Sequence, residues 1–268
     1  MTSPIAPPGR DARRHGPGPA FPAAQQRIRS VPIWGAPLRA MHWIAGACIA
    51  TLVVTGLYIA RPYFSTTGEA SAHFAMGRMR FVHFTAAAVL VMTGIVRLYW
   101  LFAGNQFERI SALFPLTRKN LKAMGSTINS FATFRFDKEP RFVGHNPLQQ
   151  IAYTSVYLMT LFMVVTGFTL YGQSNPGGLI FRAFGWVPPL LGGLQVVRLL
   201  HHGLTWAFVI FFIIHVYFAI RADYLERQGV VSSMITGDRF VDVSKTYEDF
   251  DAGTVPVRAW QVDERPRK

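Results

Sequence analysis

The stretch that decides the fold is LLHHGLTWAFVIFFIIHVYFAIR, which runs from Leu199 to Arg221. It is apolar over about the 20 residues that an α-helix needs to cross a bilayer. Histidines lie near both of its ends, with His201 and His202 at the start and His215 towards the finish. Ionisable side chains are costly inside a membrane, so their presence in such a span indicates a functional site.

Helical geometry separates these histidines into two groups. A spacing of 14 residues places His201 and His215 within about 40° of one face and about 21 Å apart along the axis. His202 is 13 residues from His215 and faces about 140° away. We therefore expect His201 and His215 to act from one face. Gly203 is a weak helix former and can disturb the helical phase beside it, so His202 stays the alternative to His201.

The composition agrees with a membrane protein. Half of the 268 residues are hydrophobic and only 15% are charged, whereas soluble domains carry about a quarter charged residues. The net charge of +13 is better explained by membrane topology than by nucleic-acid binding. Cys48 is the single cysteine, which excludes an internal disulfide, a cysteine-ligated iron–sulfur cluster and a covalently attached haem.

Three other segments are long and apolar enough to cross the membrane. With the opening stretch, the expected spans are about 40–60, 81–103, 148–171 and 199–221. Aromatic residues gather near the ends of these segments, as they do at membrane interfaces. The sequence thus predicts an all-α membrane protein with four transmembrane helices in a bundle.

Lysine and arginine are unevenly distributed over the connections. Six lie in the segment up to Arg39 and seven in residues 104–146, against three between the first two spans and two between the last two. Basic loops remain in the cytoplasm, so both termini and the middle connection are expected there, in a bacterial inner membrane. The two remaining connections then face the periplasm, and the last, rich in Gly, Pro and aromatics, suits a docking surface or cap.

The chain divides into three parts on this interpretation. Residues 1–30 are rich in Pro, Gly and Arg and are expected to form a disordered basic arm. Residues 31–225 hold the four transmembrane helices, and residues 226–268 form a cytoplasmic tail that begins with a short helix.

The topology sorts four histidines by depth. His42 starts the first span and His215 lies late in the fourth, so both are expected near the cytoplasmic side. His83 starts the second span and His201 starts the fourth, so both are expected near the periplasmic side. Two imidazoles at one depth can bind a haem iron on both faces, which predicts two stacked b-type haems.

Two glycines fit the same layout. Gly56 lies 14 residues after His42, and Gly94 lies 11 residues after His83, each close to the ligand's face but at the opposite depth. Glycine lets a flat macrocycle approach a helix that does not ligate it, although helix packing through small residues is the alternative.

Three arginines complete the candidate haem sites. Arg39, Arg80 and Arg198 each lie three residues before a candidate ligand, about one turn away. They are candidates to pair with haem propionates near the membrane surfaces, or they are ordinary snorkelling residues at span ends. His145, in the motif GHNP, is expected to have a structural role at the start of the third span.

The motifs GEASAHFAMGRMRFVHF, GHNPLQQ and HVYFAIRADY, with WGAPLRAMHWIAGACIATLVVTGLYI before them, resemble the b-type cytochrome subunit of membrane-bound nickel–iron uptake hydrogenases. This resemblance covers roughly residues 31–239, and the family is related to the gamma subunits of formate dehydrogenases. His42, His83, His201 and His215 match its haem-ligand positions.

The resemblance implies partners and a direction of electron flow. A small iron–sulfur subunit and a large nickel–iron subunit would lie on the periplasmic side, so hydrogen activation belongs to the partner. Electrons would cross two haem b groups to a membrane quinone, expected near the His42 end of the first span and the start of the tail.

Three other readings remain open. A cytochrome b subunit of a formate dehydrogenase-type or other quinone-linked oxidoreductase shares the ligand pattern with another donor. A metal-ion transporter predicts acidic residues within the spans, and the four expected spans contain none. A cofactor-free membrane anchor predicts that the histidines are dispensable.

Overall fold

We describe a computed structural model of the chain. It describes residues 28–64, 67–68, 73–113, 124–126, 129, 133, 141–242 and 245–249. Most of the predicted N-terminal arm, the end of the tail and much of the connection between the second and third spans therefore lie outside the described residues.

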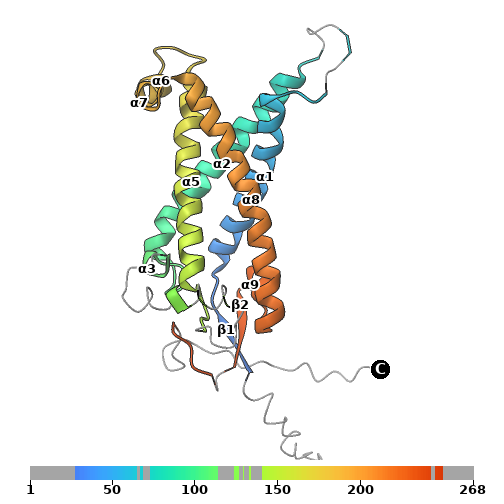
Figure 1. The fold of residues 1–268 in the computed structure, drawn as a ribbon, viewed down its shortest axis with the longest axis vertical. Helices are drawn as coiled ribbons and strands as arrows, with labels where there is room; N and C mark the ends of the chain where they lie inside the picture. The colour runs from blue at the N-terminus through green and yellow to red at the C-terminus, as the bar shows by residue number, and fades with distance from the viewer. Residues whose placement is uncertain are drawn as a thin grey trace, which may run out of the picture.

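Four long helices form the body of the molecule (Figure 1): α1 (Ala36–Ala60), α2 (Ala75–Ala103), α5 (Pro147–Gly172) and α8 (Leu194–Glu226). Each is long and apolar enough to cross a membrane, which confirms the prediction of four such helices. The helices exceed the predicted spans because their polar end turns continue the helix beyond the apolar stretch.

The helices alternate in direction along the chain (Figure 1). α1 packs along α2, α5 packs along α8, and α1 also contacts α8. One end of the bundle, here called the cap end, carries two short helices, α6 (Leu179–Phe184) and α7 (Val187–Leu191). The opposite end, here called the sheet end, carries α3 (Ile110–Leu113), α9 (Val230–Thr236) and two strands.

The two strands correct the expectation of an all-α chain. β1 (Ile28–Pro32) pairs antiparallel with β2 (Asp238–Asp242), with Ile28 opposite Asp242. β1 begins inside the segment expected to be a disordered arm, and β2 lies in the predicted tail. Each strand has five residues and its partner lies about 200 positions away, so no local pattern reveals the pairing.

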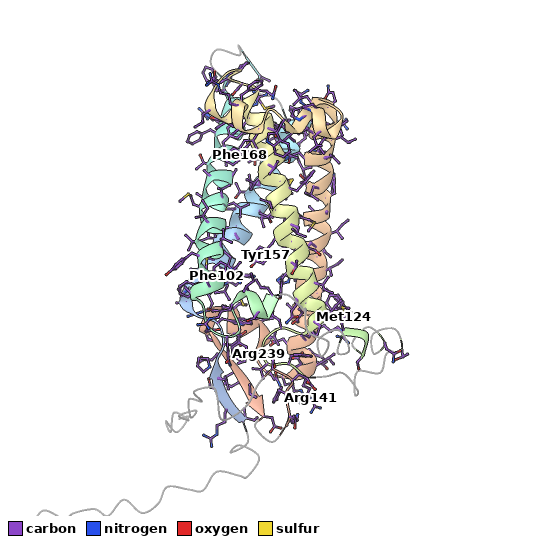
Figure 2. All side chains as sticks on the ribbon, turned by 90° about the vertical axis from the view of Figure 1, so that its left-hand side faces the viewer. Phe102, Met124, Arg141, Tyr157, Phe168 and Arg239 are labelled. Atoms are coloured by element: carbon purple, nitrogen blue, oxygen red, sulfur yellow. The ribbon has the colours of Figure 1, made fainter. Side chains whose placement is uncertain are left out.

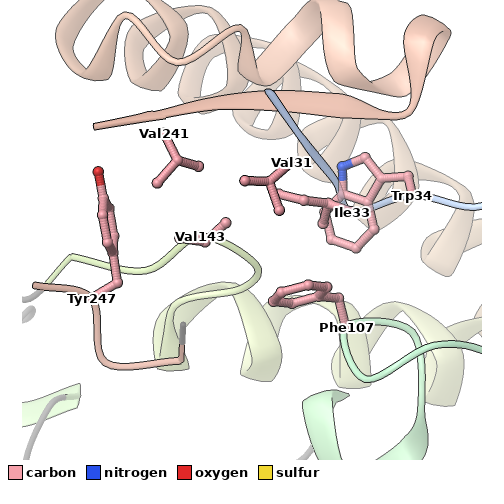
Figure 3. Packing of buried hydrophobic residues seen from close by; sticks show 7 residues of the cluster. All are labelled: Val31, Ile33, Trp34, Phe107, Val143, Val241 and Tyr247. Atoms are coloured by element: carbon pink, nitrogen blue, oxygen red, sulfur yellow. The ribbon is translucent and has the colours of Figure 1, made fainter. Parts of the chain in front are cut away.

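The sheet end contains the main hydrophobic core. Figure 3 shows its buried side chains, which come from β1 and β2, from the residues after each strand, and from the segments beside α3 and α5: Val31, Ile33, Trp34, Phe107, Val143, Val241 and Tyr247. Along the four long helices, by contrast, large apolar side chains such as Phe81 and Tyr99 are exposed. Figure 2 shows this outward-facing layer, which suits contact with lipid.

Buried polar side chains also hold the sheet end together. Arg239 donates to the carbonyl of Val143 at 2.5 Å, to Glu226 Oε2 at 2.6 Å and to Gln228 Oε1 at 3.0 Å. Figure 2 places Arg239 low in the molecule, at the sheet end. Because a buried guanidinium is stable only with such acceptors, this network fixes β2 against the ends of α8 and α5.

The start of α5 follows from the motif GHNP. Asn146 is the N-cap, and its side chain accepts from the backbone N–H of Gln149 while the Gln149 side chain accepts from the N–H of Asn146. Pro147 occupies the first helical position, where a missing N–H costs nothing. This reciprocal capping confirms that the motif starts a helix.

Candidate functional site

The alternating helices place the four candidate ligands in two groups. His42 lies in the second turn of α1, and His215 lies in the last third of α8, so both are nearer the sheet end. His83 lies early in α2, and His201 lies early in α8, so both are nearer the cap end. We call them the sheet-end pair and the cap-end pair.

The sheet-end pair faces across the interface between α1 and α8. The ring centroids of His42 and His215 are 6.2 Å apart, and the ring planes are inclined by 52°. A metal bound to one nitrogen of each ring at about 2 Å places the two centroids about 6 Å apart. Nδ1 of His42 is buried and has no hydrogen-bond partner within the described residues. The pair therefore fits a bis-imidazole iron.

Aromatic rings surround the sheet-end pair. Phe211, one turn before His215, stacks on its ring at 5.5 Å with an interplanar angle of 15°. Tyr153 of α5 meets the same ring edge-on at 6.4 Å, and Trp43 meets the ring of His42 edge-on at 5.2 Å. These histidines are thus oriented mainly by packing.

The cap-end pair is oriented by hydrogen bonds. Nδ1 of His83 lies 2.9 Å from Oγ1 of Thr55 on α1, and Nδ1 of His201 lies 2.8 Å from Oγ1 of Thr166 on α5. The two imidazoles lie near enough to each other to interact electrostatically. Both Nε2 atoms lack a hydrogen-bond partner in the part of the chain that the structure describes, which leaves them available to a metal.

Sequence reasoning missed the two threonines. Each is followed by a glycine, but the same dipeptide occurs at Thr93-Gly94 on α2, so the sequence alone does not single these two threonines out. A Cβ atom added to Gly56 would lie 3.2 Å from Cε1 of His83, and one added to Gly167 would lie 3.3 Å from Cε1 of His201. Gly56 thus has a ligand ring as its neighbour, a contact that the sequence argument did not name. A Cβ added to Gly94 would meet nothing within 4 Å.

The three candidate propionate partners have different surroundings. Arg39 donates from Nη1 to the carbonyl of Ile235 in α9, which ties the start of α1 to the tail. Arg198 is exposed and donates to Gln195 Oε1 at 3.2 Å, and Arg80 is exposed as well. These contacts do not test whether each arginine pairs with a haem propionate, so that role stays a prediction.

The two other histidines near the candidate site have different environments. His145 lies between the rings of Trp34 and Tyr153, with both centroids 4.9 Å away. Burial, together with smaller effects of the charges of Arg97 and Arg239, lowers the pKa of His145 to about 3. A neutral, sandwiched imidazole agrees with a structural role. His202 is half-buried beside His201.

Together these features define the class of protein: a multi-pass membrane protein with four helices and paired histidines suited to haem iron. The chain belongs to the prokaryotic cytochrome b561 family, whose family model matches residues 33–237.

Curated relatives agree with this membership. The chain is 41% identical over 220 residues to the probable Ni/Fe-hydrogenase B-type cytochrome subunit of Cupriavidus necator, covering 81% of this chain and 90% of the relative. It is 39% identical over 214 residues to the protein of that name from Bradyrhizobium diazoefficiens, covering 78% and 86%. The probable Ni/Fe-hydrogenase 1 B-type cytochrome subunit of Escherichia coli is 34% identical over 212 residues, covering 77% and 89%.

These findings confirm the resemblance seen in the sequence. A b-type cytochrome binds haem b, so the comparisons support haem b as the cofactor. Three features fit this cofactor: the spacing of the sheet-end rings, and, within the described residues, the lack of a hydrogen-bond partner for Nδ1 of His42 and for Nε2 of His83 and His201.

Proposed function

We propose that this chain is the haem b subunit that anchors a periplasmic nickel–iron hydrogenase in the bacterial inner membrane. In this role it carries electrons from the iron–sulfur clusters of its partner, through two stacked haems, to membrane quinone. The observation that carries the proposal is the presence of two histidine pairs at two depths, both using α8. The names of the relatives support the choice of hydrogenase as the partner.

The distribution of charge supports an orientation. The basic connections predicted to be cytoplasmic join the helices at the sheet end, so this end would face the cytoplasm and the cap end the periplasm. Phe168 of α5 stacks on Phe184 of α6 at 5.3 Å, which holds the short helices over the cap end. Leu179 and Leu190 project from them, exposed by 83% and 69%. An apolar surface of this kind suits the docking of a periplasmic subunit.

The ligand assignment follows from the two pairs. His83 and His201 would hold one haem on the periplasmic side, and His42 and His215 would hold the other on the cytoplasmic side. Haem b supplies reversible one-electron chemistry when it is bound. Open space at Gly94 supports its proposed role beside the macrocycle at the sheet end.

Three further roles belong to the same proposal. Gly56 would give room at the cap end, and Arg39, Arg80 and Arg198 would pair with propionates near the two surfaces. Each of these arginines lies within one turn of a ligand, so a charge-assisted contact to a carboxylate is within reach of its side chain.

The quinone is expected at the sheet end, beside the start of α1. An apolar groove of about 520 Å³ lies there between α1 and α2, and it is lined by Pro37, Ala40, Met41, Ile44, Ala88, Val89, Met92, Thr93 and Val96. Its lining suits the isoprenoid tail of a quinone. The groove follows α1 past His42, which would bring the quinone head towards the second haem.

Haem content per chain tests the proposal. The complex purified from membranes is expected to show a reduced-minus-oxidised spectrum of b type and two haems per chain. His201→Ala should remove one haem, whereas His202→Ala, the matched control, should keep both. Absence of a b-type spectrum in the wild-type protein, or two haems retained in His201→Ala, would contradict the assignment.

A further inference from the structure

Of the three Thr-Gly pairs in the long helices, two make the same contact in separate halves of the bundle. On α1, Thr55-Gly56 faces His83 of the neighbouring helix α2; on α5, Thr166-Gly167 faces His201 of the neighbouring helix α8. The hydroxyl-to-Nδ1 distances are 2.9 and 2.8 Å. Thr55 and Thr166 are 5% and 0% exposed, so water does not compete for either contact.

The direction of each hydrogen bond follows from a second contact of the hydroxyl. Oγ1 of Thr55 lies 2.7 Å from the carbonyl oxygen of Thr51, and Oγ1 of Thr166 lies 2.8 Å from that of Phe162. A carbonyl oxygen can only accept, so the single hydroxyl proton must point to it. Each Oγ1 therefore accepts from Nδ1–H of the histidine, and the lone pair of the imidazole is on Nε2.

The glycines let each ring lie against the backbone of the neighbouring helix. An added Cβ would come within 3.2 Å of His83 Cε1 at Gly56, and within 3.3 Å of His201 Cε1 at Gly167. Both distances are shorter than ordinary carbon contacts of about 3.5–4.0 Å. The threonine fixes the tautomer and direction of the ring, and the glycine fixes its depth.

We propose that Thr55 and Thr166 are positioning residues for the haem held by the cap-end pair, and that their hydroxyls lower its midpoint potential. This inference rests on the proposed function. An imidazole that donates from Nδ1 becomes a stronger electron donor through Nε2. A stronger axial donor stabilises ferric over ferrous iron, which moves the potential downwards.

The sheet-end pair lacks this arrangement. Nδ1 of His42 is buried without a hydrogen-bond partner in the described chain, and the ring of His215 is held by Phe211 and Tyr153. The hydroxyls therefore act on one haem of the two. They place the lower potential at the end where the partner's electrons enter, so that transfer towards the sheet end runs downhill.

Redox titration of the purified complex, monitored by the b-type absorbance, tests this inference. Thr55→Val and Thr166→Val keep the side-chain shape and remove the acceptor, whereas Thr55→Ser and Thr166→Ser retain it. The matched controls are Thr51→Val and Thr169→Val, one turn away on the same helices. Their hydroxyls donate to the carbonyls of Ala47 and Val165, and within the described residues they make no hydrogen bond to a histidine.

Each valine variant is expected to raise the midpoint potential of one haem and leave the other in place. The serine variants and the two controls should titrate as the wild type does. If a valine variant loses the haem, recovery in the corresponding serine variant supports the positioning role. Unchanged potentials in both valine variants, or equal shifts in the controls, overturn it.

The haem content of the same samples distinguishes a failure of the proposed function from a failure of this inference. A wild-type complex without haem b, or a His83→Ala variant that keeps both haems, contradicts the proposed function itself. Two haems in the wild type, one in His83→Ala, and unmoved potentials in both valine variants contradict the inference alone.

Discussion

The cap-end and sheet-end histidine pairs differ in the contacts that hold their rings in place. His83 and His201 each donate to a threonine hydroxyl and lie against a glycine. His42 and His215 lie among aromatic rings, and the Nδ1 atom of His42 has no partner in the described chain. One pair is thus oriented by directional bonds and the other by shape. If both pairs bind haem as proposed, this difference allows the two sites to be tuned separately, although α8 would supply a ligand to both.

Removing a sheet-end ligand should have the largest effect. His215→Ala is expected to reduce the haem content from two per chain to one and to abolish quinone reduction, because the second haem and the path beyond it are lost. The remaining haem should still be reduced by hydrogen in the intact complex. A haem assay with a hydrogen-to-quinone activity measurement checks this, and full quinone reduction by the variant would contradict it.

Filling the space at Gly94 should have a smaller effect that is confined to one pair. Gly94→Ala is expected to lower the content of the sheet-end haem, since an added Cβ would occupy the space expected for the macrocycle. Without the haem, the substitution should stabilise the helix by up to about 1 kcal/mol, because alanine is a better helix former than glycine. Gly46→Ala on α1, where a Cβ also meets nothing within 4 Å, is the control. Equal haem content in both variants would favour a packing role for Gly94.

The buried network at the sheet end should matter more to the sheet-end pair than to the cap-end pair. Arg239→Ala leaves the carbonyl of Val143 and the side chain of Gln228 without their donor. An unpaired buried polar group costs about 2 kcal/mol, so the variant should unfold at a lower temperature. Thermal denaturation in detergent, followed by separate titration of the two haems, measures this. Equal loss of both haems would show that the network supports the whole bundle.

The last prediction concerns pH and vanishes at neutral pH. The folded-state pKa of His145, about 3, lies below its ordinary value of about 6.5, so the unfolded chain binds more protons between these values. Stability is therefore fully present above about pH 6.5 and falls as the pH is lowered towards 3. His145→Gln, which cannot be protonated, is expected to show a flatter decline of melting temperature over pH 6.5 to 4. An unchanged slope would exclude His145 as its source.

The sequence predicts the features that depend on residues close together in the chain. The apolar runs predict the four helices, and the 14-residue spacing of His201 and His215 places both on one side of α8. The start of α5 at Asn146 follows from capping chemistry that lies within four residues.

The missed features depend on residues far apart in the chain. Thr55 and Thr166 sit in helices where threonine usually bonds its own backbone, so only the neighbouring helix reveals their contact with a histidine. The pairing of β1 with β2 joins the two ends of the described chain. The acceptors of Arg239 lie on two segments, Val143 before α5 and Glu226 and Gln228 at the end of α8, and no spacing rule connects them.

The placement of His201 and His215 on one unbroken helix has a mechanical consequence. The distance between the two ligands is set by the rise of α8, about 21 Å over 14 residues, and not by the packing between helices. Thermal breathing of α1 or α2 can tilt a haem, but it cannot lengthen this spacing. If His201 and His215 bind haem as proposed, α8 sets the distance between the two haem sites. Insertion of a single residue between His201 and His215 would turn one imidazole about 100° away from its present direction.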